Sequence, residues 1–113
     1  MRNLSEYLQI ITTTPSRADA LELADTLIRT HLAPCFQIIG PILSIFSWKD
    51  KIEKSEEWLC LIKTRNDYYK DVEKAILEVH PYDVPEILAV PILEANEDYL
   101  TWMNRELIKN PKK

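Results

Sequence analysis

Residues 35–64 read CFQIIGPILSIFSWKDKIEKSEEWLCLIKT and contain two long runs of β-branched, aromatic and other apolar side chains. The runs from Cys35 to Trp48 and from Ile52 to Thr64 lie on either side of Lys49-Asp50, at the spacing of a two-residue β-hairpin. Gly40-Pro41 interrupts the first run, and a proline inside a strand is typical of a sheet edge or of a β-bulge. This stretch therefore predicts a long hairpin whose first strand lies at an edge or carries a bulge.

The residues on either side of the hairpin form further strand-like and helix-like runs. The run from Tyr7 to Thr13 is β-branched and shows little polar alternation, which is typical of a strand in the middle of a sheet. Apolar residues then recur at helical spacing in two segments, and Pro81 disfavours a helical conformation in the residue before it. In chain order we expect a strand at 7–13, a helix that follows Ser16 and ends near Leu32, the hairpin, a helix from Tyr68 to His80, a strand from Glu86 to Leu93, and a helix capped by Asn96.

This order predicts an α+β fold: a ferredoxin-like βαββαβ sandwich with a long hairpin between its second and third strands and an extra C-terminal helix. Ser16 with Asp19, and Thr64 with Asp67, have the spacing of capping boxes at helix starts. With 113 residues, 46% of them hydrophobic, the chain has room for a single domain at 1–113, and we expect a disordered tail at 110–113. Seven prolines against one glycine, Gly40, predict that nearly every connection avoids positive φ angles.

The charge balance limits the kinds of partner that we expect, and the cysteines indicate the cellular compartment. Fourteen basic and eighteen acidic residues give a net charge of −4 without a basic stripe, so we expect no nucleic-acid partner. No stretch is long and apolar enough for a membrane helix, and the first residues lack a secretion signal, so we expect no membrane partner. Two cysteines, Cys35 and Cys60, without C-x-x-C spacing indicate a reducing compartment. The expected localisation is cytoplasmic.

The segment from His80 to Glu86 concentrates ionisable side chains in a short connection. Pro81 and Pro85 fix φ near both ends of a loop that carries an imidazole, a phenol and two carboxyl groups. Such a loop suits a binding site, and the alternative is a tight helix-to-strand connection in which His80 only bonds a carbonyl. Lys63 and Glu86 stand at the ends of apolar runs, and they either meet in a shared pocket or reach solvent separately.

The sequence contains no pattern typical of an active site or of a closed metal site. His31 and Cys35 have metal-ligand spacing, but Pro34 separates them from a common helix. There is no Ser-His-Asp set, no glycine-rich phosphate loop and no H-E-x-x-H motif, so we expect no enzyme and assign no catalytic residue. Trp48 near the hairpin tip would be exposed in a lone subunit, and a long edge hairpin pairs readily with a neighbouring chain. We therefore expect a homo-oligomer.

A set of short motifs extends in order along nearly the whole chain. They are Leu32-Ala33-Pro34-Cys35, Ser44-Ile45-Phe46-Ser47-Trp48 with Lys51 and Glu53, Lys63-Thr64, His80-Pro81-Tyr82 with Pro85-Glu86, Pro91, and Tyr99-Leu100 with Trp102. In these motifs the sequence resembles the CutA divalent-cation tolerance family. The resemblance implies a homotrimer of ferredoxin-like subunits, similar in architecture to the PII signalling proteins, in which long hairpins join neighbouring sheets.

The same resemblance implies a function and a set of site residues. We expect a role in tolerance of copper and other divalent cations, as a metal- or small-ligand-binding and sensing module, with a divalent cation such as copper as the expected cofactor. The alternative is an enzyme or a PII-like metabolite sensor that uses a cleft between subunits, with Lys63 as an anion anchor. His80 is the candidate metal ligand and Cys35 a further one, whereas Thr12 and Val79 stand where some members carry a cysteine and a histidine. The inter-subunit ligand cleft is expected to be lined by Gln37, Trp48, Lys63, Tyr82, Glu86 and Trp102.

Overall fold

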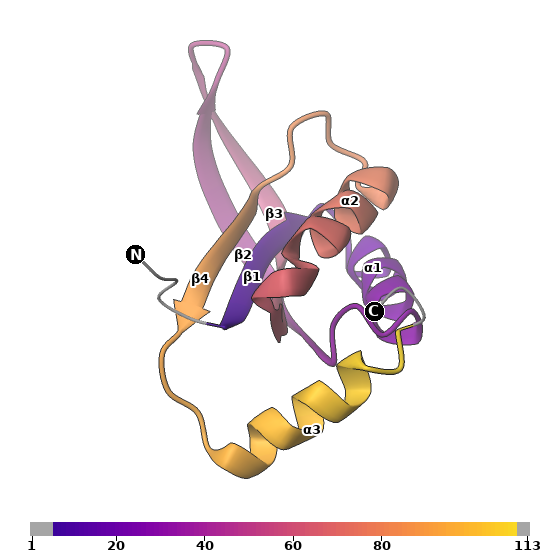
Figure 1. The fold of residues 1–113 in the computed structure, drawn as a ribbon. Helices are drawn as coiled ribbons and strands as arrows, with labels where there is room; N and C mark the ends of the chain where they lie inside the picture. The colour runs from indigo at the N-terminus through magenta and orange to yellow at the C-terminus, as the bar shows by residue number, and fades with distance from the viewer. Residues whose placement is uncertain (1–5, 111–113) are drawn as a thin grey trace.

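The computed structural model describes residues 6–110 as one four-stranded antiparallel sheet with three α-helices (Figure 1). The strand order is β2-β3-β1-β4, so β1 is central and β2 and β4 are the two edges. This order confirms the predicted α+β, ferredoxin-like fold, the central place of the first strand and the edge position of the second. The elements are β1 (Tyr7–Thr14), α1 (Arg17–Arg29), β2 (Cys35–Trp48), β3 (Lys51–Arg65), a short 3-10 helix (Asn66–Tyr68), α2 (Tyr69–Val79), β4 (Ile87–Ile92) and α3 (Glu97–Leu107).

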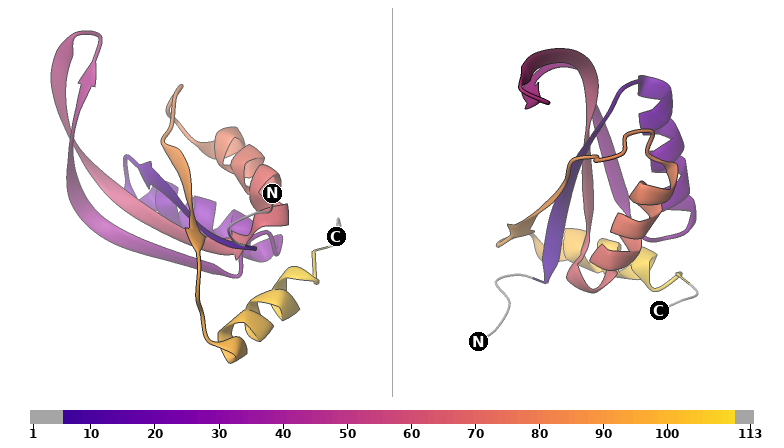
Figure 2. Two further views of the ribbon diagram at one scale, coloured as in Figure 1. Left: turned by 60° about the vertical axis from the view of Figure 1, so that its left-hand side comes forward. Right: turned by 90° about the horizontal axis from the view of Figure 1, so that it is seen from above.

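The hairpin of β2 and β3 projects beyond the rest of the sheet and curves along its length (Figure 2). Trp48 pairs with Lys51, so Lys49 and Asp50 form the predicted two-residue turn. Both turn residues have positive φ, 52° at Lys49 and 65° at Asp50, as a type I′ hairpin turn requires. The expectation that positive φ would be avoided is therefore wrong at the hairpin tip, because the twist of the two strands selects that turn even without glycine.

Gly40 has a different role from the one its scarcity suggests, because its φ is not positive. The register between β2 and β3 shifts between Ile39 and Ile42, which places a β-bulge at Gly40-Pro41 and confirms the predicted irregularity. A Cβ atom on Gly40 would lie 2.5 Å from Cδ1 and 2.7 Å from Cγ of Trp58. Glycine is needed here because the indole ring lies directly against the backbone of the bulge.

Helices α1 and α2 cover one face of the sheet, and the hydrophobic core lies between these layers (Figure 2). Side chains alternate along each strand, so Ile10 of β1 and Ile62 of β3 face the helices while their neighbours in sequence face the other way. Tyr68 is fully buried in the same cluster, and its hydroxyl donates a 3.0 Å hydrogen bond to Leu107 O. Between residues 6 and 110, no helix is long and apolar enough to cross a membrane.

The helix ends agree with only some of the predicted caps. Ser16 caps α1 as expected, because its hydroxyl oxygen accepts a 3.1 Å hydrogen bond from Asp19 N–H. The helix ends at Arg29 rather than near Leu32, because His31 adopts a left-handed φ of 57° that directs the chain back toward the sheet. Asn96 precedes α3 at the N-cap position but makes no side-chain capping bond.

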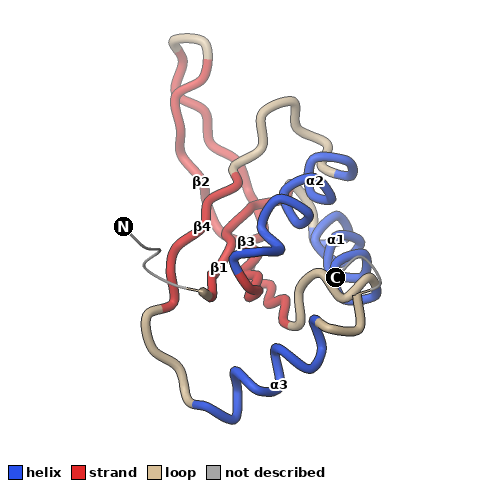
Figure 3. The backbone as a smooth tube through the Cα atoms, viewed as in Figure 1, coloured by secondary structure: helices blue, strands red, loops and turns tan. Residues whose placement is uncertain are grey.

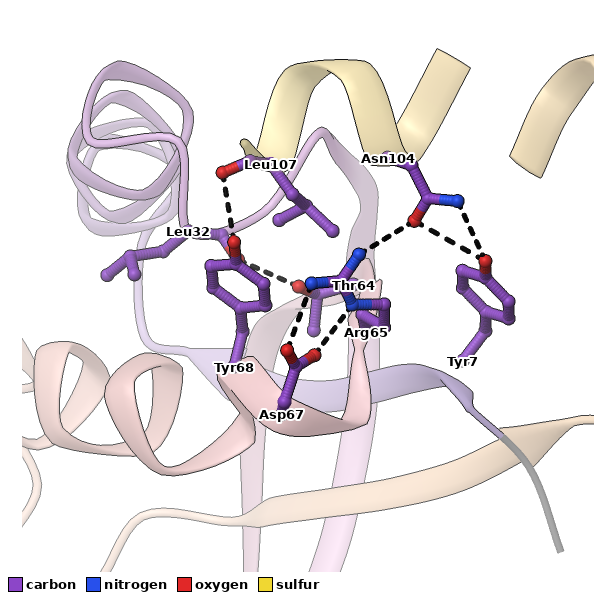
Figure 4. A network of polar contacts seen from close by, with 8 residues as sticks. All are labelled: Tyr7, Leu32, Thr64, Arg65, Asp67, Tyr68, Asn104 and Leu107. Atoms are coloured by element: carbon purple, nitrogen blue, oxygen red, sulfur yellow. Dashed lines mark hydrogen bonds and ion pairs between the residues drawn. The ribbon is translucent and has the colours of Figure 1, made fainter. Parts of the chain in front are cut away.

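The capping box predicted for Thr64 and Asp67 is wrong, because both side chains have other partners. The Thr64 hydroxyl donates a 2.8 Å bond to Leu32 O, and Asp67 forms an ion pair with Arg65 at 2.7 Å. Arg65 also donates to Asn104 Oδ1 at 3.0 Å, and Asn104 Nδ2 lies 3.0 Å from the Tyr7 hydroxyl (Figure 4). This network holds α3 at the end of the sheet opposite the hairpin tip (Figure 1).

Asn110 does not belong to a disordered tail as expected. Its side chain is buried, and Nδ2 donates a 2.6 Å hydrogen bond to Thr30 O at the end of α1. The remaining residues of the expected tail, 111–113, lie outside the described residues. Asn110 thus fixes the chain after α3 against the helical layer.

Thr12→Val is expected to raise the free energy of unfolding by about 1 kcal/mol, because a buried hydroxyl without a partner costs free energy that an isosteric methyl group avoids. Thr12 is fully buried on β1, and within residues 6–110 its Oγ1 has no hydrogen-bond partner. Thr64→Val is the matched control, since it removes the bond to Leu32 O and should lower stability by about 1–2 kcal/mol. Urea unfolding of both variants measures the difference, and a destabilised Thr12→Val protein would contradict the argument.

Candidate functional site

A groove of about 460 Å³ lies between the outer half of the hairpin and the loop that joins α2 to β4. The loop and the hairpin tip extend from the same end of the sheet (Figure 3). We call this feature the hairpin groove. Its lining residues are Phe46, Trp48, Glu53, Lys54, Ser55, Tyr82, Asp83 and Val84.

His80 fixes the loop side of the hairpin groove through both nitrogens of its ring. Nε2 lies 2.6 Å from Thr13 O, and Nδ1 accepts a 3.1 Å hydrogen bond from Tyr82 N–H. Since a backbone N–H needs an acceptor, these partners place the ring proton on Nε2, where it is donated to Thr13 O. The His80 and Tyr82 rings are 4.9 Å apart between centroids. His80 therefore does bond a carbonyl, as one of the two sequence interpretations held, and it also positions Tyr82 at the groove.

Tyr82 connects the loop to the hairpin through a carboxylate that the sequence did not single out. Its hydroxyl donates a 2.8 Å hydrogen bond to Glu57 Oε2, and Glu57 is only 6% exposed. Burial and this hydrogen bond raise the pKa of the Tyr82 phenol, so the hydroxyl stays protonated and acts as a donor at neutral pH. Glu57 follows Glu56 in an acidic stretch of β3, and only the strand register distinguishes the buried residue from its exposed neighbour.

The six residues expected to line a ligand cleft fall into separate places in one chain. Trp48 and Tyr82 meet at the hairpin groove. Lys63 donates a 2.6 Å hydrogen bond to Gln37 Oε1 across β2 and β3. Glu86 is exposed just before β4, and Trp102 lies on α3.

Lys63 and Glu86 make no ion pair within residues 6–110, so the two charges do not neutralise each other in one chain. The ammonium of Lys63 has the neutral Gln37 amide as its hydrogen-bond partner. Trp102 packs against Tyr99 with ring centroids 5.4 Å apart. The cleft predicted from these six residues would thus need more than one copy of the chain.

The proposed metal ligands do not form a site within one chain. Residues 6–110 contain no group of three or more His, Cys, Asp or Glu side chains placed to hold an ion. A metal at His80 would have to replace one of the two hydrogen bonds of its ring. Cys35 lies against Tyr99, and burial together with that thiol raises the pKa of the Tyr99 phenol to about 12. Burial raises the pKa of Cys60 to about 11, which leaves that thiol protonated and a poor ligand at neutral pH.

Known proteins match this chain over nearly its whole length. The sequence model of the family described as "CutA1 divalent ion tolerance protein" matches residues 8–106. The chain belongs to the CutA1 family. The divalent-cation tolerance protein CutA of Pectobacterium atrosepticum is 35% identical over 106 residues, which cover 94% of this chain and 96% of that protein. Protein CutA of Mus musculus is 37% identical over 93 residues, which are 82% of this chain and 52% of the mouse protein.

Solved CutA1 structures agree with the fold described above. CutA1 from a Shewanella species superposes with a TM-score of 0.88 at 35% identity, over 90% of this chain and 95% of that one. A structure described as the periplasmic divalent cation tolerance protein CutA from Archaeoglobus fulgidus gives a TM-score of 0.87 at 33% identity, over 89% of this chain and 98% of that one. The family model and the curated relatives are described as divalent ion or divalent-cation tolerance proteins, a description that names no catalysed reaction.

Proposed function

We propose that this CutA1 protein acts in divalent-cation tolerance as a homotrimeric binding module whose ligand sites lie between copies of the chain. The observation that supports this proposal is the sheet face that none of the helices between residues 6 and 110 covers (Figure 2). Ile39, Leu88 and Val90 remain 50%, 54% and 41% exposed on this face. The register places them on the same side as Ile11, Leu59 and Leu61.

Exposing such an apolar face to water costs free energy. Packing the face against other copies of the chain removes this cost. The face spans all four strands and is bounded by the two sheet edges, β2 and β4, where unpaired backbone groups favour strand pairing with another chain. The projecting hairpin adds exposed apolar side chains beyond the sheet, namely Leu43, Ile45, Phe46, Trp48 and Ile52. A trimer in which hairpins join neighbouring sheets, as the resemblance to the CutA family implies, would cover both surfaces.

Sedimentation equilibrium at micromolar concentration tests the assembly. The expected mass is three times that of the 13.2 kDa chain, and a mass of one chain would reject the trimer.

We place this assembly in the cytoplasm. Both cysteines are free thiols, and a reducing compartment keeps thiols in this state.

The divalent-cation part of the proposal is tested by calorimetry with Cu²⁺ and Zn²⁺ at neutral pH. We expect the wild type to bind these ions. His80→Asn should keep the affinity within about twofold of the wild type, because both nitrogens of His80 already have protein partners. An asparagine amide oxygen is able to accept the Tyr82 N–H in place of Nδ1, which preserves the loop. Absence of any binding rejects the divalent-cation part, and a large loss in the variant identifies His80 as a ligand.

Lys63 gives one observation in favour of the second candidate, a PII-like sensor of an anionic metabolite. Its ammonium lies on the uncovered sheet face, and among residues 6–110 it has no carboxylate partner. A charge that becomes covered on assembly needs a counter-charge, which an anionic ligand or an acidic side chain of another copy supplies. An acidic residue of a neighbouring copy seen within 4 Å of Lys63 in a trimer structure would remove this argument.

A further inference from the structure

We infer that a second groove, between α1 and α2, binds a small zwitterion, namely an α-amino acid with an aliphatic side chain. The groove has a volume of about 480 Å³, which is within the range of small-molecule sites. We call it the helix groove. Its walls include Thr26, Thr30, Lys74, Ala75, Glu78 and Asn110.

The position of the helix groove keeps it apart from the surfaces that the proposed trimer covers. Its residues lie on α1 and α2 and in the segments that follow α1 and α3. None of them belongs to the uncovered sheet face, to the hairpin or to the six residues of the predicted inter-subunit cleft. Both helices lie on the opposite side of the sheet (Figure 2). We therefore expect the helix groove to stay open to solvent in the trimer.

Two opposite charges on α2 line the helix groove without a protein partner. Lys74 and Glu78 are exposed, and within residues 6–110 neither side chain has an ion-pair or hydrogen-bond partner. They are one helical turn apart, and lysine before glutamate is the weaker order for an ion pair at this spacing. An ammonium group and a carboxylate thus lie on one wall of the groove, and each is available to a ligand.

Two further charged or titratable groups of the lining have partners within the protein. Arg29 forms an ion pair with Asp25 on the preceding turn of α1. His31 Nδ1 lies 3.9 Å from Glu106 Oε1, and Glu106 also forms an ion pair with Lys109 at 3.0 Å. These pairs leave the two groups on α2 as the ones that a charged ligand would meet first.

The lining of the helix groove carries no net charge. Arg29 and Lys74 are its positive groups, Asp71 and Glu78 are its negative groups, and the histidine is counted as neutral. Residues 112–113, two lysines that follow in the sequence, lie outside the described residues. A lining with both signs and no excess of either favours a ligand that also carries both charges, because a simple anion or cation would meet repulsion as well as attraction.

Neutral groups complete the helix groove. Ala75 of α2 and Leu32, which is only 8% exposed, form its apolar part. Thr30 Oγ1 donates a 2.8 Å hydrogen bond to Thr26 O, and Asn110 Nδ2 donates a 2.6 Å hydrogen bond to Thr30 O. These bonds hold the α1 wall before any ligand arrives, which lowers the entropic cost of binding. An aliphatic side chain has an apolar surface here, beside the two charges of α2.

The test compares L-leucine with two analogues of similar shape that each lack one charge, by calorimetry of the purified full chain. 4-Methylpentanoate lacks the ammonium group, and 3-methylbutylamine lacks the carboxylate. EDTA in the buffer removes any metal ion through which an amino acid could bind. We expect L-leucine to bind, and each analogue to bind at least about tenfold more weakly.

Two variants test the charged groups, and a third is their matched control. Lys74→Gln and Glu78→Gln should each weaken L-leucine binding at least about fivefold, because each removes one charged partner of the ligand. Lys70→Gln should leave the affinity unchanged, since Lys70 is an exposed lysine of the same helix that pairs with Glu73 and does not line the groove. All three changes are at exposed positions, so the variants should keep the circular dichroism spectrum and the mass of the wild type.

The inference is overturned if L-leucine gives no heat at millimolar concentration, or if either analogue binds as tightly as L-leucine. Unchanged L-leucine affinity in either Lys74→Gln or Glu78→Gln overturns it as well. The proposed function fails separately, through the mass and the Cu²⁺ and Zn²⁺ titrations, none of which involves an amino acid. A trimer that binds divalent cations but not L-leucine rejects only this inference.

Discussion

Gly40→Ala is expected to lower the free energy of unfolding by about 2–3 kcal/mol, an unusually large loss for the addition of one methyl group. The new Cβ would lie 2.5 Å from Cδ1 and 2.9 Å from Nε1 of Trp58. These are atoms of a rigid ring and not the end of a flexible chain, so relief requires the indole or the bulge backbone to move. Urea unfolding with matched m-values measures the loss.

A double-mutant cycle separates the ring contact from any backbone effect of alanine. In a Trp58→Leu background the ring is absent, so Gly40→Ala should cost less than about 1 kcal/mol there. Ala89 on β4 offers a matched control, since Ala89→Gly changes the same atoms at an exposed strand position without a facing ring. An equal loss from Gly40→Ala in both backgrounds would mean that the indole is not the cause.

The hairpin shows what could be predicted from sequence and why. Its two runs of β-branched and aromatic residues are long, and the two-residue gap at Lys49-Asp50 allows one register. The role of Gly40 was not predictable, because it depends on Trp58, which lies eighteen positions later in the sequence and reaches the bulge only once the strands pair. A sequence pattern identifies a break in a strand, but not the side chain that packs against this break in the folded protein.

The candidate site was predicted less completely than the fold. Trp48 and Tyr82 were expected in a cleft between subunits, which stays a prediction, and in one chain both line the hairpin groove. Glu57 was missed because it stands next to Glu56, and alternation alone does not tell which carboxylate a distant tyrosine will cover. The failed cap at Thr64 has a related cause, because its hydroxyl donates to Leu32 O, which comes near only when the chain folds. The helix end at His31 is local: His31 takes a left-handed φ, and Leu32 N–H donates to Leu27 O.

Val90→Glu is expected to convert the proposed trimer into a monomer, because it places a carboxylate among the exposed apolar side chains of the uncovered sheet face. Val90 is 41% exposed in one chain and lies opposite Gln9 on β1, close to Leu88 on the same strand. Burying an unpaired charge costs several kcal/mol, and a three-fold arrangement repeats that cost in every subunit. Sedimentation equilibrium should show the mass falling from three chains to the 13.2 kDa of one chain.

The control is Leu77→Glu, the same kind of change at an exposed position of α2 outside the sheet face. Because β4 is an edge strand and its outer side chains meet no helix, Val90→Glu should leave the monomer folded, with the circular dichroism spectrum of the wild type. Val90→Thr, which keeps the shape without a charge, should retain the trimer at lower stability. If Val90→Glu sediments as a trimer while Leu77→Glu does not, the subunits associate through the helical layer and not through the sheet.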